Sequence, residues 1–297
     1  MRLARVLGAV GRTFITAGVL ILLFVAYQLW GTGIREAQAQ GRLEDAFEEA
    51  LADAEHERTT STTTPDAPAD PETVPPIELP PDGEPVARIL IPKIGVDKIV
   101  VEGPSLKNLK QGPGHFPETP LPGQEGNAAI AGHRTTYGAP FNRIDELEPG
   151  DEIIVETVQG RFRYEMSEQL IVSPSEVHVL EDKGDNRITL IACHPKYSAR
   201  QRIVVVGQLA PEHEPLPPPV RAEPAPAPAT FDDIDGEGAS VVPTVLLGLG
   251  CALIWLAAWF LGRRWRRWPA YALGLPFFLV TLFFFFEEFS RFLPASY

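Results

Sequence analysis

Apolar residues gather in three long runs and, between the first and second of these, in a series of short segments. The long runs cover residues 15–30, 241–262 and 269–286. Each approaches the ~17–25 residues that a helix needs to cross a bilayer. The pattern therefore predicts transmembrane helices over residues 13–30, 241–262 and 269–286.

The short apolar segments lie within residues 85–210 and have the length and composition of β-strands. They read ARILI, KIVVE, NAAIA, EIIVET, GRFRYEM, EQLIVS, RITLIAC and RIVVVGQL. Glycine and proline separate most of them, and Gln159-Gly160 predicts a tight hairpin between the fourth and the fifth. Eight strands in about 125 residues predict an all-β domain, folded as a closed or nearly closed barrel without exposed strand edges.

The segments on either side of this domain are polar. Leu43, Phe47 and Leu51 recur every four residues, which predicts a short helical stalk over residues 34–57. The rest of residues 31–84 is rich in Thr, Pro and acidic residues, so we expect a disordered or extended linker. Residues 211–240 form a second, Pro-rich acidic linker, for which we expect a semi-rigid polyproline-like arm.

The net charge of −13 is concentrated in the two linkers. Residues 31–84 carry a net −11 and residues 211–240 a net −6, whereas residues 85–210 carry only −2. The predicted domain therefore lacks the basic surface that binding of nucleic acid requires, and we expect no nucleic-acid partner.

Arginines flank the long apolar runs and orient them in the bilayer. Three precede the first run, and four lie in RRWRRW between the second and third. Segments rich in arginine next to transmembrane helices remain on the cytoplasmic side of the membrane. Residues 1–12 and 263–268 are therefore predicted to be cytoplasmic, and residues 31–240 and the tail 287–297 to be outside. The alternative is a signal peptide cleaved at Ala37-Gln38-Ala39, but the first run is longer than a typical signal-peptide core. We therefore favour an uncleaved anchor and a multi-pass protein of the cell membrane.

Cys193 is the only cysteine in the predicted extracytoplasmic part of the chain. The other cysteine, Cys251, lies inside a predicted span, so no disulfide between them is expected. A free thiol outside the cytoplasm is at risk of oxidation. The residues alone leave two interpretations of Cys193 open, a nucleophile and a buried structural cysteine.

A cysteine nucleophile needs a group that manages its proton. His194 is adjacent, but neighbouring residues of a strand point to opposite faces, so we expect its side chain to point away from Cys193. His115, His133 and His178 remain as candidates within the domain. His133 is weakly favoured, because it follows an apolar strand and begins a loop, where reactive side chains are often presented.

An acyl-transfer site also needs a donor for the oxyanion that develops on the substrate. The loop HPKYSARQ separates Cys193 from the strand that begins at Arg202. If the two strands are neighbours, Cys193 and Arg202 lie side by side at one end of the barrel. Arg200 has the same parity but lies further into the loop, and either arginine can equally be a surface charge.

Three separated motifs, in order, resemble the sortase family. GPGHFPETPLPGQEGNAAIAGHR resembles the segment that leads to the family's histidine, and AGHRTTYGAPF resembles the histidine motif itself. TLIAC followed by RIVVV resembles the TLxTC signature with its downstream arginine. GHRTTYGAPF and CHPKYSARQR are similar to class E sortases of actinobacteria. The resemblance covers residues 85–210 and implies an eight-stranded sortase-type β-barrel, here with one N-terminal and two C-terminal transmembrane helices.

The resemblance also implies an activity. Sortases are cysteine transpeptidases that cleave a sorting signal of the LPxTG or LAxTG type between Thr and Gly and join the protein to an amine. Carried over, Cys193 is the nucleophile, His133 the general acid and base, and Arg202 the oxyanion or substrate clamp. The implied partners are secreted proteins with C-terminal sorting signals and an amine from a peptidoglycan precursor or a pilin lysine. No cofactor or metal is implied.

Some features depart from the family pattern and leave alternatives open. Ala192 stands where the family commonly has Thr, and the C-terminal pair of spans is unusual. Pilus-polymerising sortases carry a C-terminal span and an Asp-Pro-aromatic lid, but PPDGEPVARILIP contains no such lid, so attachment to the cell wall is favoured. A cell-wall cysteine hydrolase usually places its cysteine at a helix N-terminus. In a membrane-tethered binding domain, Cys193, His133 and Arg202 would lie apart.

Overall fold

The computed structural model describes residues 2–61, 80–216, 231, 240–264 and 267–290. The chain forms two compact units. One contains Met1–Gly31 and Glu237–Pro294, and the other is built mainly from Thr32–Gly236.

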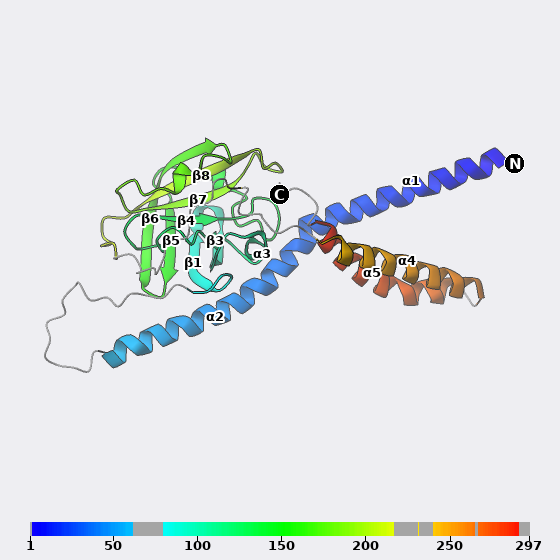
Figure 1. Cartoon of the computed structure of the whole chain (residues 1–297), viewed down its shortest axis with the longest axis horizontal. Coiled ribbons are helices and arrows are strands. Elements are labelled where there is room, and N and C mark those ends of the chain that lie inside the picture. Colours follow the sequence, from blue (N-terminus) through cyan, green and yellow to red (C-terminus); the bar gives the residue numbers. More distant parts are fainter. Residues whose placement is uncertain (1, 62–79, 217–230, 232–239, 265–266, 291–297) are drawn as a thin grey trace. The chain divides into compact units, whose positions relative to one another are not determined.

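Eight strands of the second unit close into a barrel (Figure 1). In chain order they are β1 (Pro85–Ile91), β2 (Val96–Glu102), β3 (Gly114–His115), β4 (Asn127–Ala131), β5 (Glu152–Thr157), β6 (Gly160–Val172), β7 (Arg187–His194) and β8 (Gln201–Leu209). Around the barrel they follow the order β1-β2-β3-β4-β7-β8-β6-β5. The β2–β3 and β4–β7 pairs are parallel, and the other neighbours are antiparallel.

The predicted eight-stranded barrel is confirmed, but the identity of two strands is corrected. GRFRYEM and EQLIVS are parts of one strand, β6, whose register against β8 shifts between Met166 and Glu168. Such an irregularity breaks the alternation and makes one strand read as two. The strand that the sequence analysis missed is β3, whose two residues are too few to show an alternating pattern. The predicted hairpin joins β5 to β6, with Thr157 paired to Gly160, so its turn lies one residue earlier than expected.

Strands β4, β7 and β8 are buried on both faces. Leu190 and Ala192 belong to the core that fills the barrel. The alternate residues, such as Ile191 and Val204, belong to a second apolar cluster on the other face of the sheet. Burial on both faces explains why these strands read as nearly continuous apolar runs. Alternation then places Cys193 in the outward-facing series with Ile191.

The long helix of the second unit is α2 (Thr32–Ser61), which includes the predicted stalk, and a short helix, α3 (Leu106–Leu109), follows β2. Its predicted apolar stripe is present, but the helix does not stand alone. Leu43 and Phe47 are buried against Ile99 and Val101 of β2. The period of the helix and the strand KIVVE are both visible in the sequence, whereas the packing of one against the other is not.

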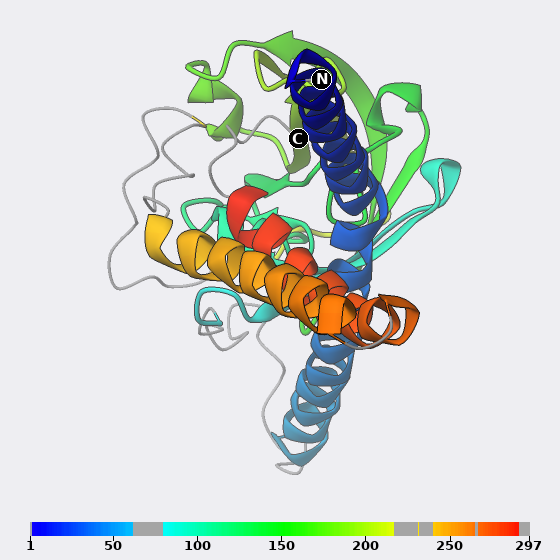
Figure 2. The same cartoon turned by 90° about the vertical axis from the view of Figure 1, so that its right-hand side faces the viewer.

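The first unit is helical. It contains α1 (Arg2–Ala26), a short π-helix (Tyr27–Gly31), α4 (Val241–Arg264) and α5 (Arg267–Ser290). Helices α4 and α5 lie side by side in both views (Figure 1, Figure 2). Cys251 is buried there among Tyr27, Leu282 and Phe286, where it packs as a small apolar residue.

Three of the described helices are long and apolar enough to cross a membrane. They are Val10–His56, Val241–Arg264 and Trp268–Ser290, and they include the three predicted spans. With these helices, all-β describes the barrel and is not exact for the chain as a whole. The long apolar runs form helices because a helix satisfies the backbone hydrogen bonds within its own segment.

Several predictions fall outside the described residues. The prediction of a disordered or extended first linker falls largely on residues 62–79, and that of a polyproline-like arm falls on residues 217–230 and 232–239, all of which lie outside the described residues. The centre of the basic loop, 265–266, and the end of the tail, 291–297, lie outside as well. The assignment of the two sides of the membrane also stays a prediction.

Candidate functional site

Cys193 and Arg202 are direct partners in the antiparallel β7–β8 ladder. The connection HPKYSARQ reverses the chain between them, and the pairing predicted from the sequence is present. Arg202 is buried, and its Nη1 donates to the carbonyl oxygens of Ala199 (2.8 Å) and Gln201 (3.2 Å). The guanidinium is therefore tied to the backbone at the start of β8.

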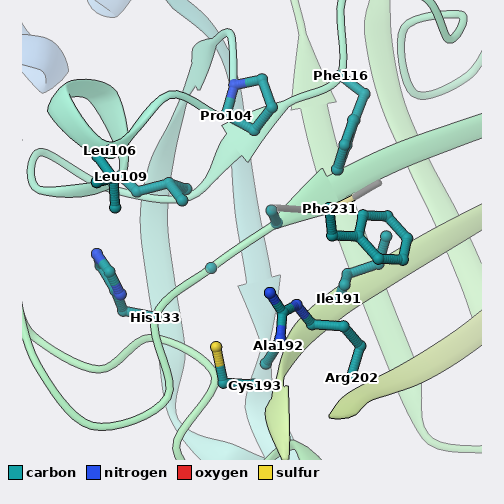
Figure 3. Close-up of a pocket in the computed structure, with 12 residues that line it drawn as sticks. Pro104, Leu106, Leu109, Phe116, His133, Ile191, Ala192, Cys193, Arg202 and Phe231 are labelled. Atoms are coloured by element: carbon teal, nitrogen blue, oxygen red, sulfur yellow. The ribbon is translucent and has the colours of Figure 1, made fainter. Parts of the chain in front are cut away.

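Strand β4, the other strand that pairs with β7, brings His133 to the same end of the barrel as Cys193 and Arg202. Strand β4 runs parallel to β7 with Ala131 opposite Ile191, and the Gly132 N–H donates to the Ile191 carbonyl oxygen at 3.0 Å. Two residues further along each chain are His133 and Cys193. The side chains of His133, Cys193 and Arg202 line one pocket and face a common space (Figure 3).

Apolar side chains form the rest of this pocket. They come from the segment after β2, from the start of the loop after β3, from β7 and from the second linker, and they include Leu106, Leu109, Phe116, Ile191 and Phe231. The pocket is thus an apolar groove with a thiol, an imidazole and a guanidinium on its wall, the usual makeup of a ligand site.

Phe231 was not predicted to belong to the site, because it lies in the Pro-rich linker. It is nevertheless buried, and its N–H donates to the Pro174 carbonyl oxygen at 2.9 Å. Its ring meets that of Phe116 edge to face, with the centroids 6.2 Å apart. Phe231 therefore closes the apolar end of the pocket, a contact that no local pattern in the sequence indicates.

The other candidate histidines lie elsewhere. His115 is fully buried, with Nδ1 2.8 Å from Glu102 Oε2 and Nε2 2.9 Å from the Pro120 carbonyl oxygen. It holds β3 and the following turn together. His178 is exposed on a short 3-10 helix, Val177–Leu180. Neither lines the pocket, and neither does His194.

Arg134 is a residue of the site that the sequence argument missed. It is buried, and its Nη1 donates to the Cys193 carbonyl oxygen (3.3 Å) and lies 3.0 Å from His194 Nδ1. Its Nη2 is 2.8 Å from Asp145 Oδ2. Burial alone would raise the pKa of Asp145, but the hydrogen bond and charge of Arg134 outweigh burial and lower it. Arg134 thus ties the loop after β4 to the end of β7.

Tyr137 is a second residue that was missed. Its ring lies beside the His133 imidazole, with centroids 5.2 Å apart and planes inclined by 33°. Tyr137 is buried, and its backbone has a φ of 50°, which is uncommon for a residue with a side chain. The only sequence signal for Tyr137 and Arg134 is their place next to His133 in AGHRTTYGAPF.

This arrangement can support acyl transfer, since it brings together a nucleophile, an acid–base group and an oxyanion donor. Cys193 lies on a strand and not at a helix N-terminus, which argues against the hydrolase alternative. The three side chains also converge, whereas a binding domain predicts that they lie apart. Among the described residues, no cluster of three or more His, Cys, Asp or Glu side chains is suited to hold a metal ion.

Comparison with known proteins places this chain among sortases. The family model of the sortase domain matches residues 89–210. Sortase SrtE1 of Streptomyces coelicolor is 38% identical over 224 residues, which are 69% of this chain and only 57% of that protein. Sortase SrtE2 of the same organism is 30% identical over 222 residues, which are 69% of this chain and 83% of that protein.

Among solved structures, sortase E1 from Streptomyces coelicolor with a tripeptide in the active site is similar to this chain. The two are 39% identical, the match covers 43% of this chain and 89% of the solved chain, and the TM-score is 0.41.

The contacts of Arg134 lead to a prediction about stability. Arg134→Met removes a donor to the end of β7 and leaves Asp145 only its longer ion pair with Lys196, at 3.9 Å. We expect the free energy of unfolding to fall by about 2 kcal/mol, less than for a fully buried pair, because Asp145 stays partly hydrated. Hydrogen exchange of the β7 and β8 amides in the full chain measures this loss.

Arg143→Met is the matched control, because Arg143 also pairs with a carboxylate, that of Glu146. The Arg143 side chain is 51% exposed, against 2% for Arg134, so its removal should leave the exchange nearly unchanged. The lowered pKa of Asp145 stabilises the fold above the ordinary pKa of the carboxyl, and this effect is lost in acid. The difference in the free energy of unfolding between wild type and Arg134→Met should therefore become smaller as the pH falls. Equal effects of the two substitutions would contradict the role of Arg134.

Proposed function

Because this chain belongs to the sortase family of transpeptidases, we propose that it is a membrane-anchored cysteine transpeptidase. It cleaves a sorting signal of the LPxTG or LAxTG type between Thr and Gly and joins the protein to a cell-wall amine. The observation that carries this proposal is the convergence of Cys193, His133 and Arg202 on one apolar pocket.

In the first half of the reaction, the Cys193 thiolate attacks the carbonyl carbon of the signal's Thr. A C–S bond forms, and negative charge develops on the carbonyl oxygen, where the Arg202 guanidinium stabilises it. The C–N bond to Gly then breaks, and the His133 imidazolium gives its proton to the leaving amine. The product is a thioester between the protein substrate and Cys193.

In the second half, an amino group attacks the thioester carbonyl. His133, now neutral, takes a proton from the attacking amine, an amide bond forms and the C–S bond breaks, which restores the thiolate. Water that attacked instead would yield hydrolysis, so a transferase must favour the amine. The apolar wall formed by Leu106, Leu109 and Phe116 suits the Leu and the Pro or Ala of the signal.

The partners follow from this reaction. We expect secreted proteins with C-terminal sorting signals as acyl donors and a peptidoglycan precursor as the amine. Attachment to the wall is preferred over pilus polymerisation, because the segment before β1 contains no Asp-Pro-aromatic motif. The three apolar helices fit a multi-pass protein of the cell membrane, and the arginine clusters orient its catalytic domain to the outside.

The covalent intermediate is the direct test of this proposal. Incubation of the full chain in detergent with LAxTG and LPxTG peptides should give a thioacyl adduct on Cys193 by mass spectrometry. Cys193→Ala should give none, since no nucleophile remains. An added amine should convert the adduct into an amide product, which separates a transferase from a hydrolase. A folded protein that gives no adduct with either peptide would exclude this activity.

The role of Arg202 is tested against its neighbour in the loop. Arg202→Ala should lower kcat by about 10²–10³-fold, the usual effect of removing one oxyanion donor. Arg200→Ala is the control, because Arg200 has the same charge, is exposed and does not line the pocket. Its kcat should stay near that of the wild type. Similar losses in both variants would show that positive charge near the groove, and not a placed donor, supports the reaction.

A further inference from the structure

Glu36 of α2 is a buried carboxylate that the proposed reaction does not use. It is 2% exposed, and its Oε1 lies 2.5 Å from Nζ of Lys98 on β2. Burial raises the pKa of Glu36 above its ordinary value, and the hydrogen bond and charge of Lys98 offset only part of this rise. A buried ion pair is weak evidence for stability, because both groups lose their hydration.

The Glu36 carboxylate lies against the loop that follows His133. A Cβ built on Gly138 would come within 2.4 Å of Glu36 Oε2, so a residue with a side chain at 138 would displace the carboxylate. One helical turn earlier, Thr32 is also buried, and its Oγ1 accepts the Tyr137 N–H at 3.2 Å. Residues four apart share one face of a helix, so α2 holds Tyr137 and Gly138 from the same side.

The part of the loop that α2 holds has an unusual backbone. Tyr137, Gly138 and Ala139 have φ values of 50°, 72° and 42° in succession. Residues with side chains rarely adopt such angles and keep them only where surrounding contacts impose them. The contacts from Thr32 and Glu36 are of this kind.

The conformation of this loop bears directly on His133. The Tyr137 ring lies beside the imidazole, with centroids 5.2 Å apart, and the Phe141 N–H donates to the His133 carbonyl oxygen at 3.1 Å. If residues 137–139 changed conformation, the ring of Tyr137 would move, and the imidazole would lose the surface that limits its rotation.

We propose that Thr32 and Glu36 of α2 are positioning residues that set the orientation of His133 through Tyr137. The inference rests on the proposed transpeptidase function and deepens it, because it makes the docked helix part of the site. Lys98 keeps the Glu36 side chain in place on the barrel, and Gly138 provides the close approach that the carboxylate needs. His133 is then held from one side by its own strand and from the other by α2.

The test compares variants of the full chain in detergent. Glu36→Ala should lower kcat for transpeptidation by about ten-fold or more, as expected when an acid–base group is misplaced, with little change in KM. Glu36→Gln should retain most of kcat, because the amide keeps the shape and still accepts from Lys98. Alkylation of Cys193 by iodoacetamide should reach completion in both variants, whatever its rate, which shows that the thiol stays accessible in the pocket.

Glu44→Ala is the matched control. Glu44 is on the same helix and also pairs with a barrel residue, Arg88, but its side chain is 47% exposed and the pair does not reach the histidine loop. Its kcat should match the wild type. Thr32→Val, which removes the acceptor for the Tyr137 N–H, provides a second variant if Glu36→Ala does not fold, and it should also lower kcat.

Two different failures can be told apart. If the wild type forms no thioacyl adduct, the proposed function itself is wrong. If the wild type is active and both Glu36→Ala and Thr32→Val keep the kcat of Glu44→Ala, the positioning role is overturned while the function stands. A rise in KM with unchanged kcat would also overturn it, since that result assigns α2 to peptide binding.

Discussion

Hydrogen-bonded pairing on both sides of β7 is the constraint on which the site depends. The antiparallel ladder with β8 sets Cys193 opposite Arg202, and the parallel ladder with β4 brings the chain to His133. Both faces of these strands are buried, so their register is strongly specified. A slip of one residue would turn Cys193 into the barrel. The packing of the barrel core thus fixes the positions of the thiol and the guanidinium relative to each other.

Pairing between strands cannot fix the imidazole, because His133 lies beyond the end of β4. Its loop is held by contacts from distant parts of the chain. Arg134 donates to the carbonyl oxygen of Cys193 and pairs with Asp145. The ring of Tyr137 lies beside the imidazole, and Thr32 accepts the Tyr137 N–H. A loop held in this way can present a reactive group with the accuracy that acid–base chemistry needs. Helix α2 therefore contributes to the function that we propose, because it holds this loop.

The parts of this structure that follow from local patterns were predictable. Strand period and hairpin geometry placed Cys193 beside Arg202, and Leu43, Phe47 and Leu51 revealed a helix with an apolar stripe. The choice of His133 over His115 and His178 was only weakly supported by the residues and became firm through the family resemblance. The strand β3, the unity of β6, the docking of α2 and the roles of Arg134, Tyr137 and Phe231 were missed. Each depends on an irregular register or on contacts between residues far apart in sequence, which periodicity does not encode.

The most direct measurement is a crystal structure of the protein carrying a sorting-signal peptide with a reactive carbonyl, bound covalently to Cys193. Such an adduct mimics the tetrahedral intermediate. We expect its oxygen to lie about 3 Å from the Arg202 guanidinium, the distance of an oxyanion donor. The His133 imidazole should lie on the side of the leaving group, with Tyr137 still beside it. An adduct whose oxygen points to solvent, with Arg202 turned away, would contradict the account.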